Sequence, residues 1–191
     1  TEWELESPLL PPRFSSHAGF AVRIQNSTAL VGASDTGSEG TVFAYEFNGS
    51  QWRLDQSITP PQRIGRANFG YAIGLDGDRL VIGAYGAFDH LGVAYLYERQ
   101  GGSEWSPLIS FDPFDVHDTL GAPPFFGDAC AVSDDLVLIG APYEDTDHGG
   151  DSGIVYAFRL DCGEDCTGSE RIRKARCEAG DCALQRWRAF L

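Results

Sequence analysis

Apolar and polar positions alternate in short stretches through the first 160 residues, and these stretches recur in the same order three times. Alternation with a period of two places successive side chains on opposite faces of a strand, so it predicts short, half-buried β-strands. Each copy starts with an alternating stretch, turns into an almost wholly apolar one, and continues after a variable polar loop into a stretch with aromatic residues at every second position. The pattern predicts an all-β chain.

The three copies share two glycines at a constant spacing. A first glycine is followed 13 residues later by a second, which always lies in a Gly-Ala pair; the paired positions are Gly19 and Gly32, Gly70 and Gly83, and Gly127 and Gly140. An internal period of about fifty residues is typical of repeat architectures, in which each unit buries its apolar surface against the next.

Each copy is expected to form four antiparallel strands, of which the fourth carries a Trp after a hairpin turn such as "NGS" or "GGS". Four-stranded units stacked face to face describe the blades of a β-propeller. A β-sandwich also uses short alternating strands, but it would not repeat the same glycines at the same spacing. We therefore expect about three blades, at residues 18–58, 68–111 and 125–160.

The two ends of the array differ from its middle. Residues 2–10, "EWELESPLL", match the Trp-bearing strands but have no blade before them, whereas the third copy lacks such a strand. We expect the N-terminal strand to supply the missing outer strand of the last blade. Because closure needs roughly four to eight blades, either partner chains complete the ring as a homo-oligomer or the sequence is a piece of a longer propeller. The lack of any Met fits a processed product or such a piece.

The formal charge of −14 lies entirely in the repeats, where residues 1–160 carry 8 basic and 22 acidic side chains. Such a surface repels phosphate backbones, so nucleic acid is not expected as a partner. It suits cations or basic partners, and it also serves simply to keep a β-rich protein soluble. No stretch approaches the roughly eighteen apolar residues of a membrane helix, so no membrane span is expected.

The second and third copies carry a specific motif. Phe69-Gly70 and Phe126-Gly127 each open a copy, and Gly140-Ala141-Pro142 ends the second strand of the third copy. These segments resemble FG-GAP repeats, the blades of the integrin α-subunit propeller and of many surface proteins. The first copy is degenerate, with Ala-Gly and Gly-Ala-Ser at the two positions. The resemblance covers about residues 2–160, and it implies an extracellular or cell-surface binding module.

The repeats depart from the calcium-binding version of the family. Blades of that version have a loop between the first two strands that resembles an EF-hand, with the pattern D-x-D/N-x-D-G-x-x-D. Here this connection is only three residues long, at 25–27, 76–78 and 133–135, which is too short to wrap six or more oxygens around Ca²⁺. The resemblance is therefore to the non-calcium variant, and no cofactor is certain.

A cation site remains a hypothesis in the longest loop. The segment "YEDTDHGGDSG" brings Asp145, Asp147 and Asp151 close together, and three carboxylates separated by glycines suit Ca²⁺ or Mg²⁺. The alternative is a solvated acidic loop that uses Asp and Gly for turns. His148 lies beside these acids, but one imidazole is a weak case for a transition metal.

No catalytic motif is evident, because the sequence has no strained nucleophile elbow, no paired carboxylates and no phosphate-binding loop. We therefore expect no enzymatic activity. Loops on a rigid scaffold commonly bind partners, and those at 34–39, 85–91 and 143–152 lie between second and third strands. The candidate ligand-binding residues in these loops are Asp35, Glu39, Asp89, His90, Glu144 and His148.

Two sequons and a cysteine-rich tail fit export from the cell. Asn26 and Asn48 head N-x-S/T sequences in predicted turns, where a glycan or ordinary Asn turn chemistry would explain them equally well. Residues 161–191 form a separate appendix, for which disulfides are favoured over a zinc site. Cys130 lies in a repeat strand and is expected to be a buried apolar residue. The disulfide candidates are Cys162, Cys166, Cys177 and Cys182.

Taken together, these features predict a non-enzymatic adhesion or protein-binding module, secreted or on the cell surface, that binds its partner through the inter-strand loops. Two alternatives stay open. One is a lectin with sugar sites repeated between blades, which a recurring exposed aromatic with a partner Asp would support. The other is an accessory propeller domain of a larger secreted enzyme.

Overall fold

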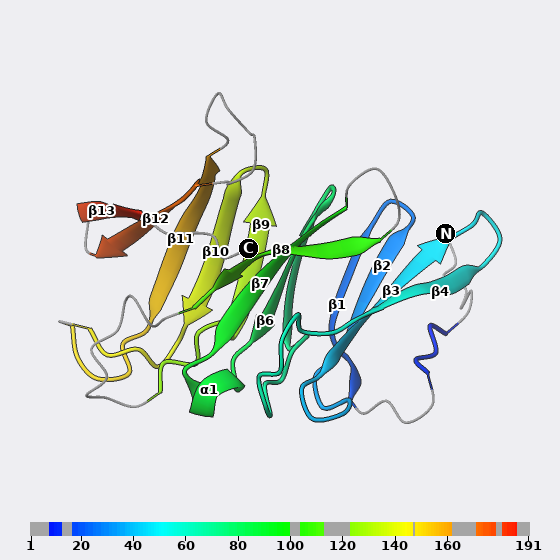
Figure 1. Cartoon of the computed structure of the whole chain (residues 1–191), viewed down its shortest axis with the longest axis horizontal. Coiled ribbons are helices and arrows are strands. Elements are labelled where there is room, and N and C mark those ends of the chain that lie inside the picture. The colour runs from blue at the N-terminus through cyan, green and yellow to red at the C-terminus, as the bar shows by residue number, and fades with distance from the viewer. Residues whose placement is uncertain are drawn as a thin grey trace, which may run out of the picture.

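The structure, a computed structural model, describes residues 8–12, 17–99, 104–112, 123–146, 148–161, 171–178 and 181–186. The strands form three antiparallel sheets, each made from strands that are consecutive in the chain. Figure 1 shows the sheets side by side in chain order. The predicted fold class, all-β with propeller-type blades, is confirmed.

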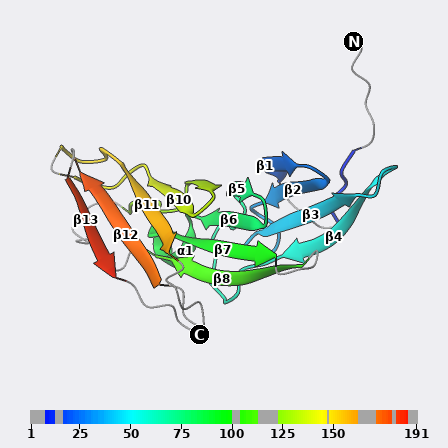
Figure 2. The ribbon, with the colours of Figure 1, turned by 90° about the horizontal axis from the view of Figure 1, so that it is seen from above.

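We call the sheets blades 1, 2 and 3. Blade 1 contains β1 (Ala18–Gln25), β2 (Thr28–Ala33), β3 (Thr41–Phe47) and β4 (Trp52–Ile58). Blade 2 contains β5 (Ala72–Asp76), β6 (Arg79–Ala84), β7 (Val93–Arg99) and β8 (Trp105–Phe111). Blade 3 contains β9 (Ala129–Ser133), β10 (Leu136–Ala141), β11 (Ile154–Asp161), β12 (Arg171–Glu178) and β13 (Asp181–Arg186). The first strands contact each other, β1 with β5 and β5 with β9, and Figure 2 shows the last strands of the blades on the opposite side.

The element α1 (Ala87–His90) is a short turn in the loop between β6 and β7 rather than a regular helix. Phe88 and Asp89 have φ values of 52° and 57°, and His90 has a φ of 71°. These left-handed conformations break the helical hydrogen-bond ladder. The turn therefore pushes three side chains outward from the end of blade 2.

The core lies between the blades. One face of blade 1, which we call its trailing face, packs with Leu30 and Val42 against the leading face of blade 2, where Ile73 and Ile82 lie. The trailing face of blade 2 packs in the same way against blade 3. Because each sheet is covered by its neighbours, the second strands read as continuous apolar runs.

The contacts between neighbouring blades, which we call joints, explain why the glycines have the same spacing in each copy. A Cβ on Gly32 would overlap the carbonyl oxygen of Gly70, and a Cβ on Gly83 would overlap that of Gly127. The second glycine of one copy thus lies against the first glycine of the next copy. The small residue is required by the neighbouring blade, because only glycine leaves room for this backbone approach.

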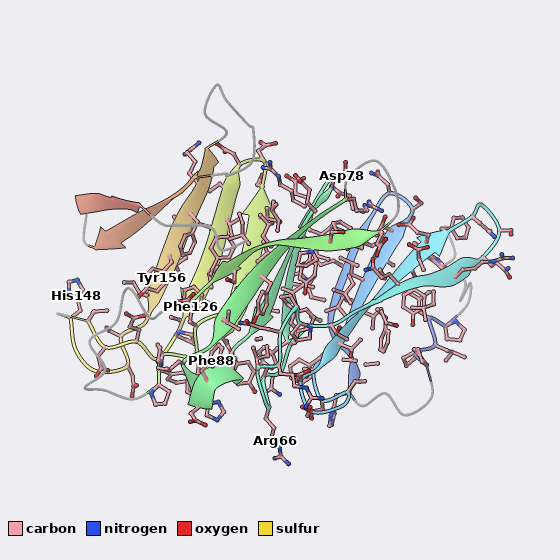
Figure 3. All side chains as sticks on the ribbon, in the orientation of Figure 1. Arg66, Asp78, Phe88, Phe126, His148 and Tyr156 are labelled. Carbon is pink, nitrogen blue, oxygen red and sulfur yellow. The ribbon has the colours of Figure 1, made fainter. Side chains whose placement is uncertain are left out.

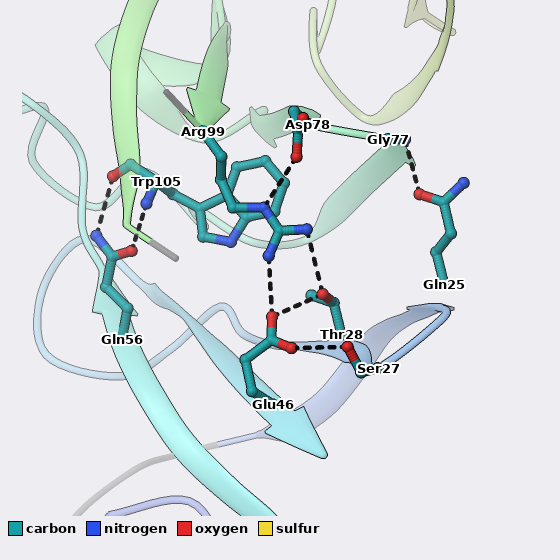
Figure 4. Close-up of polar contacts among 9 residues, drawn as sticks. All are labelled: Gln25, Ser27, Thr28, Glu46, Gln56, Gly77, Asp78, Arg99 and Trp105. Atoms are coloured by element: carbon teal, nitrogen blue, oxygen red, sulfur yellow. Dashed lines mark hydrogen bonds and ion pairs between the residues drawn. The ribbon is translucent and has the colours of Figure 1, made fainter. Parts of the chain in front are cut away.

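A polar network also joins blades 1 and 2 (Figure 4). The guanidinium of Arg99 donates to Glu46 at 2.9 Å and to the hydroxyl of Thr28 at 3.3 Å, and its Nε lies 3.4 Å from the carboxylate of Asp78. The same guanidinium lies 4.5 Å from the ring centroid of Trp105. Since Arg99 and Glu46 are both largely shielded from solvent, their ion pair contributes more than an exposed pair does, whereas the side chain of Asp78 is 72% exposed and its pair adds little.

The outer strand of blade 3 differs from the prediction. β11 pairs with β12 and β12 with β13, so part of the cysteine-rich tail occupies the place that we expected the N-terminal strand to take. The described part of the N-terminal segment lies on blade 1 instead. There Leu9 packs against a cluster of buried residues of blade 1 on the side away from blade 2, namely Ala29, Val31, Ala33, Phe43 and Tyr45. The carbonyl of Leu10 accepts a hydrogen bond from the hydroxyl of Tyr45 at 3.0 Å.

The cysteines of the tail fall partly outside the described residues. Cys162 and Cys166 lie outside them, whereas Cys177 and Cys182 are register partners on β12 and β13, where only the backbone is described. Disulfide formation stays a prediction. Cys130 packs at the edge of the core between blades 2 and 3, and burial raises the pKa of its thiol to about 12.

Raising the pH above about 10 is expected to destabilise the fold, because two core tyrosines resist ionisation in the folded state. Burial raises the pKa of Tyr95 to about 12 and also raises the pKa of Tyr97. An unfolded tyrosine ionises near about pH 10, so above that pH the unfolded state binds fewer protons than the folded state, and the free energy of unfolding falls as pH rises. Urea titrations at about pH 8 and about pH 11 measure this loss.

The variant Tyr97→Phe is the control for this effect. It removes one ionising group and one hydrogen bond, in which the Tyr97 hydroxyl donates to the carbonyl of Thr59 at 2.9 Å. We expect a lower free energy of unfolding at about pH 8 but a smaller loss between about pH 8 and about pH 11 than in the unsubstituted chain. Equal stability of the unsubstituted chain at both pH values would contradict the prediction.

Candidate functional site

The loops that follow the second strands gather at one end of the blades, which we call the loop face. Residues 34–39, 85–91 and 143–152 all begin where β2, β6 or β10 ends. Figure 3 shows Phe88 and His148 at this lower end of the sheets and Asp78 at the opposite end. The three loops that the sequence singled out therefore share one surface.

A continuous row of rings crosses the three blades on this face, and we call it the aromatic strip. It consists of Phe20, Tyr71, Tyr85, His90, Phe125 and Tyr143. Consecutive ring centroids lie 4.5 Å, 4.6 Å, 5.6 Å and 5.0 Å apart from Phe20 through Tyr71, Tyr85 and Phe125 to Tyr143. The ring of His90 stacks on those of Phe125 and Tyr85, at 5.0 Å and 6.3 Å.

The repeat pattern places these rings. Tyr71 directly follows Phe69-Gly70, and Tyr85 and Tyr143 lie just after the Gly-Ala pairs of their copies. Phe125 precedes the Phe-Gly pair of the third copy and has a φ of 56°, so the chain turns there and enters β9. Because the first strand starts and the second ends at the same end of each blade, side chains at these positions meet on the loop face.

The strip is accessible to solvent. Phe20 is 55% exposed at one end and Tyr143 is 49% exposed at the other. His90 is exposed, and the three rings in the middle are half-buried. Aromatic side chains with one covered and one open side are typical of contact surfaces, and scattered single apolar residues would not form such a row.

Carboxylates flank the strip. Asp35 forms an ion pair with His17 at 2.7 Å and accepts a hydrogen bond from the side-chain amide of Asn68 at 3.1 Å. Burial raises the pKa of Asp128, which directly follows the first glycine of the third copy. Burial also raises the pKa of Tyr85, and the charges of Asp128 and Asp35 act in the same direction. The middle of the strip therefore lies in a negative field.

The predicted ligand-binding residues separate into two groups. Asp35, Asp89, His90 and His148 are exposed on the loop face, and His90 belongs to the strip. Glu39 is half-buried and Glu144 is buried, so neither is free on that surface.

Glu39 and Glu144 hold backbone and core groups in place. Glu39 is half-buried and accepts a hydrogen bond from the N–H of Ile64 at 3.0 Å. Glu144 is only 1% exposed, and it accepts a hydrogen bond from the buried hydroxyl of Tyr156 at 2.5 Å. The placement of Glu144 in a ligand-binding surface was wrong, because the loop turns its side chain inward to pair with this hydroxyl.

The hypothetical cation site is not supported by the described carboxylates. Asp145 accepts a hydrogen bond from the N–H of Asp151 at 2.8 Å, which is the turn chemistry that we weighed as the alternative. Asp147 lies outside the described residues. Within the part of the chain that the structure describes, no cluster of three or more His, Cys, Asp or Glu side chains could hold a metal ion.

Both sequon asparagines are exposed in turns. Asn26 has a φ of 53° in the connection from β1 to β2. The side-chain oxygen of Asn48 accepts hydrogen bonds from the N–H groups of Ser50 and Gln51, each at 3.0 Å. This is ordinary Asn turn geometry, and attachment of a glycan stays a prediction.

The stacked antiparallel blades define the chain as a propeller-type repeat protein. More narrowly, residues 52–97 and 122–158 match the family model of the FG-GAP repeat, which confirms the resemblance for these two segments. The first match runs from β4 to within β7, so it joins the outer strand of blade 1 to the inner strands of blade 2. No curated protein matches the chain. Among the described residues, no helix is long and apolar enough to cross a membrane.

The strip was not predicted as a site from the sequence. Aromatic residues served there only as markers of strand faces, and the residues next to the repeated glycines were not compared. Tyr71, Tyr85 and Tyr143 all lie one or two residues after a repeated glycine motif. That recurrence was the available signal, although it could not show that the rings of different copies touch.

Proposed function

We propose that this chain is a non-enzymatic binding module of the adhesion type, which takes a protein partner on its loop face at the cell surface or outside the cell. The aromatic strip is the observation that carries the proposal. Tyrosine and phenylalanine supply much contact area at a low cost in conformational entropy, so they dominate the energetics of protein interfaces. FG-GAP repeats form the rigid scaffold that such a surface needs.

The charges favour a basic partner. The chain has a net charge of −14, and the carboxylates of Asp35, Asp89 and Asp128 lie on the same face as the strip. Lysine and arginine side chains of a partner would gain cation–π contacts with the rings and ion pairs with the carboxylates. A negative surface also accelerates encounter with a basic protein, and this effect weakens as salt is added.

Truncating the strip is expected to abolish most of the binding. We expect Tyr85→Ala, at the centre, to weaken binding about 30-fold, which corresponds to about 2 kcal/mol for an aromatic hot spot. Tyr143→Ala, at the exposed end, should weaken it less. The measurement is binding of the folded variants to an array of extracellular proteins and basic peptides, followed by titration of the strongest partner. His148→Ala, on the same face but outside the strip, is the matched control.

The outcome that would contradict this proposal is equally specific. Binding that is the same in Tyr85→Ala, Tyr143→Ala and the unsubstituted chain would exclude the strip as the contact surface. Binding that is lost only in His148→Ala would assign the function to the acidic loop instead.

A lectin is the second candidate, because one observation favours it. Tyr85 lies near enough to Asp35 and Asp128 for their charges to raise its pKa, and a sugar ring can stack on an aromatic face while its hydroxyls donate to a carboxylate. A glycan array separates the two candidates. Sugar binding that depends on Tyr85, with no specific hit among the proteins, would replace the protein partner by a glycan.

A further inference from the structure

The rings of the aromatic strip differ in inclination along the row. In the middle, the planes of Tyr85, His90 and Phe125 are nearly parallel, with angles of 19° to 23° between each pair. On either side the next ring stands steeply, because the planes of Tyr71 and Tyr85 meet at 73° and those of Phe125 and Tyr143 meet at 62°. The strip therefore has a flat middle between two steep ring pairs, Tyr71 with Tyr85 and Phe125 with Tyr143, which we call its corners.

Each corner suits one apolar ring of a ligand. A side chain in such a corner contacts the faces of two aromatic rings at once, which buries more apolar area than contact with a single ring. The two corners are joined by the step of 5.6 Å from Tyr85 to Phe125, and the rings within them are 4.6 Å and 5.0 Å apart. The centres of the corners are thus separated by at most about 10 Å, close to the roughly 9 Å that three residues of a polyproline II helix span.

The polar groups of the strip suit the same kind of ligand. Tyr71, Tyr85 and Tyr143 carry hydroxyl groups, and a phenol hydroxyl donates a hydrogen bond. A polyproline II helix has no internal hydrogen bonds, so its carbonyl groups are free to accept. The carbonyl groups of an α-helix are already bonded within the helix, and residues on one face of a β-strand repeat about every 7 Å. Neither of these conformations matches both the spacing and the donors of the strip.

Backbone hydrogen bonds hold the rings in position. The N–H of Phe125 donates to the carbonyl of His90 at 3.1 Å, and the N–H of Tyr143 donates to the carbonyl of Pro124 at 3.4 Å. These bonds tie together the loops from which the middle and one corner of the strip arise. Because the rings are positioned before binding, a ligand that is itself stiff loses little conformational entropy on them. A polyproline II segment is preformed in this way.

The negative field of the loop face selects the residues beside the prolines. Burial raises the pKa of Tyr85 most, and the charges of Asp128 and Asp35 add to this rise, so both carboxylates lie near the first corner. A lysine or arginine next to the prolines would form charge-assisted hydrogen bonds with these carboxylates, whereas an acidic residue would be repelled. Proline itself is uncharged and has no N–H that binding would leave unpaired.

We propose that the aromatic strip binds a proline-rich segment of the partner in the polyproline II conformation, with the two prolines of a P-x-x-P sequence in the two corners and a basic residue beside them. The inference rests on the proposed function, because it takes the strip as the surface that binds a protein. It adds the sequence class of the bound segment. The flat middle of the strip contacts the residues between the two prolines.

Titration with two synthetic peptides tests the proposal. The first probe is the fluorescent peptide KPAAPAAPAA, in which the prolines have the P-x-x-P spacing. The second is KPAAAPAAAP, which has the same composition but places the prolines one residue further apart. We expect fluorescence anisotropy to show micromolar binding of the first peptide to the full chain, about 10-fold tighter than binding of the second. Equal binding of the two peptides would overturn the proposal.

Variants at the two corners identify the contact. Tyr143→Ala removes one ring of a corner, and because this ring is 49% exposed the variant should remain folded, which circular dichroism checks. We expect the preference for the first peptide to fall from about 10-fold to about 2-fold or less, since one proline then meets a single ring. Tyr85→Ala should act in the same way at the other corner, and His148→Ala should keep the full preference. A full preference in Tyr143→Ala would overturn the proposal.

Asp35→Asn tests the basic residue beside the prolines. Asp35 is exposed on the loop face, and asparagine keeps an oxygen that can accept the hydrogen bond from Asn68. We expect the variant to bind the lysine-bearing first peptide about 3-fold more weakly. It should bind the same peptide with glutamine in place of lysine as well as the unsubstituted chain does. An equal loss for both peptides would contradict the pairing of lysine with this carboxylate.

Failure of this inference and failure of the proposed function give different results. If neither peptide is preferred, but a protein from the extracellular array still binds Tyr85→Ala more weakly than the unsubstituted chain, only the proline-rich segment is overturned. If no peptide and no protein binds in a way that depends on Tyr85, both proposals are overturned.

Discussion

Replacing Gly83 by alanine is expected to unfold the repeat array. The new Cβ would overlap the carbonyl oxygen of Gly127, and it would also lie 3.0 Å from the sulfur of Cys130. A carbonyl of the main chain cannot rotate away as a side chain can, so blades 2 and 3 must separate. We expect a loss of more than about 4 kcal/mol, which is a large part of the roughly 5–15 kcal/mol that stabilises a typical domain.

Urea unfolding followed by circular dichroism measures this loss. Gly140→Ala is the matched control, because it has the same place in its copy but meets only the Cβ of Ala129, at 3.2 Å. We expect the control to unfold within about 1 kcal/mol of the unsubstituted chain. Similar midpoints for Gly83→Ala and the unsubstituted chain would show that the blades do not pack through these glycines.

Phe126→Ala is expected to have the second-largest effect, a loss of about 3–5 kcal/mol. The ring is 0% exposed between blades 2 and 3, and its centroid lies 5.5 Å from that of Tyr156 and 6.5 Å from that of Phe158. Alanine would leave a cavity that the surrounding β-strands cannot fill by a small shift. The backbone of Phe126 also bridges to Gly92 of blade 2, so the cavity would open at a joint.

Tyr143→Ala provides the comparison for this core variant. It removes an aromatic ring that is 49% exposed, so we expect a change of about 1 kcal/mol or less in the free energy of unfolding. The two variants should therefore affect different properties. Phe126→Ala should destabilise the fold, whereas Tyr143→Ala should remain folded but bind the partner more weakly. Equal destabilisation by both would contradict the division between core and strip.

The first segment that matches the family model and the blades of the structure have different boundaries. The matched segment 52–97 starts in the outer strand of blade 1 and ends in the third strand of blade 2. The first matched unit of sequence therefore spans a joint, whereas the second, 122–158, begins after β8 and contains only strands of blade 3.

Several features were accessible to sequence reasoning because they depend on local geometry. Alternation over a few residues follows from the two-residue period of a strand, and the paired glycines mark where neighbouring backbones approach. The exposed turns at Asn26 and Asn48 follow from the preference of Asn for left-handed and turn conformations. Each of these signals lies within one copy of the repeat.

Other features depended on contacts between segments that are distant in the sequence. Glu144 reads as part of an acidic surface loop, but it is buried because the hydroxyl of Tyr156 needs a partner inside blade 3. The N-terminal segment reads as a spare strand for blade 3, but its described part is held on blade 1 by Tyr45. No periodicity in the sequence reports which of two equivalent places a segment takes.

By itself, the sequence determined the all-β class, the three repeats and the glycines at their joints, because each arises from short-range periodicity that every copy repeats. Only the tertiary structure decided the functional surface. The rings of the aromatic strip come from different copies, and they touch only because the blades stack with their loop ends together. The stacking also decided which apolar faces are covered, since a face is buried by its neighbour and not by its own residues.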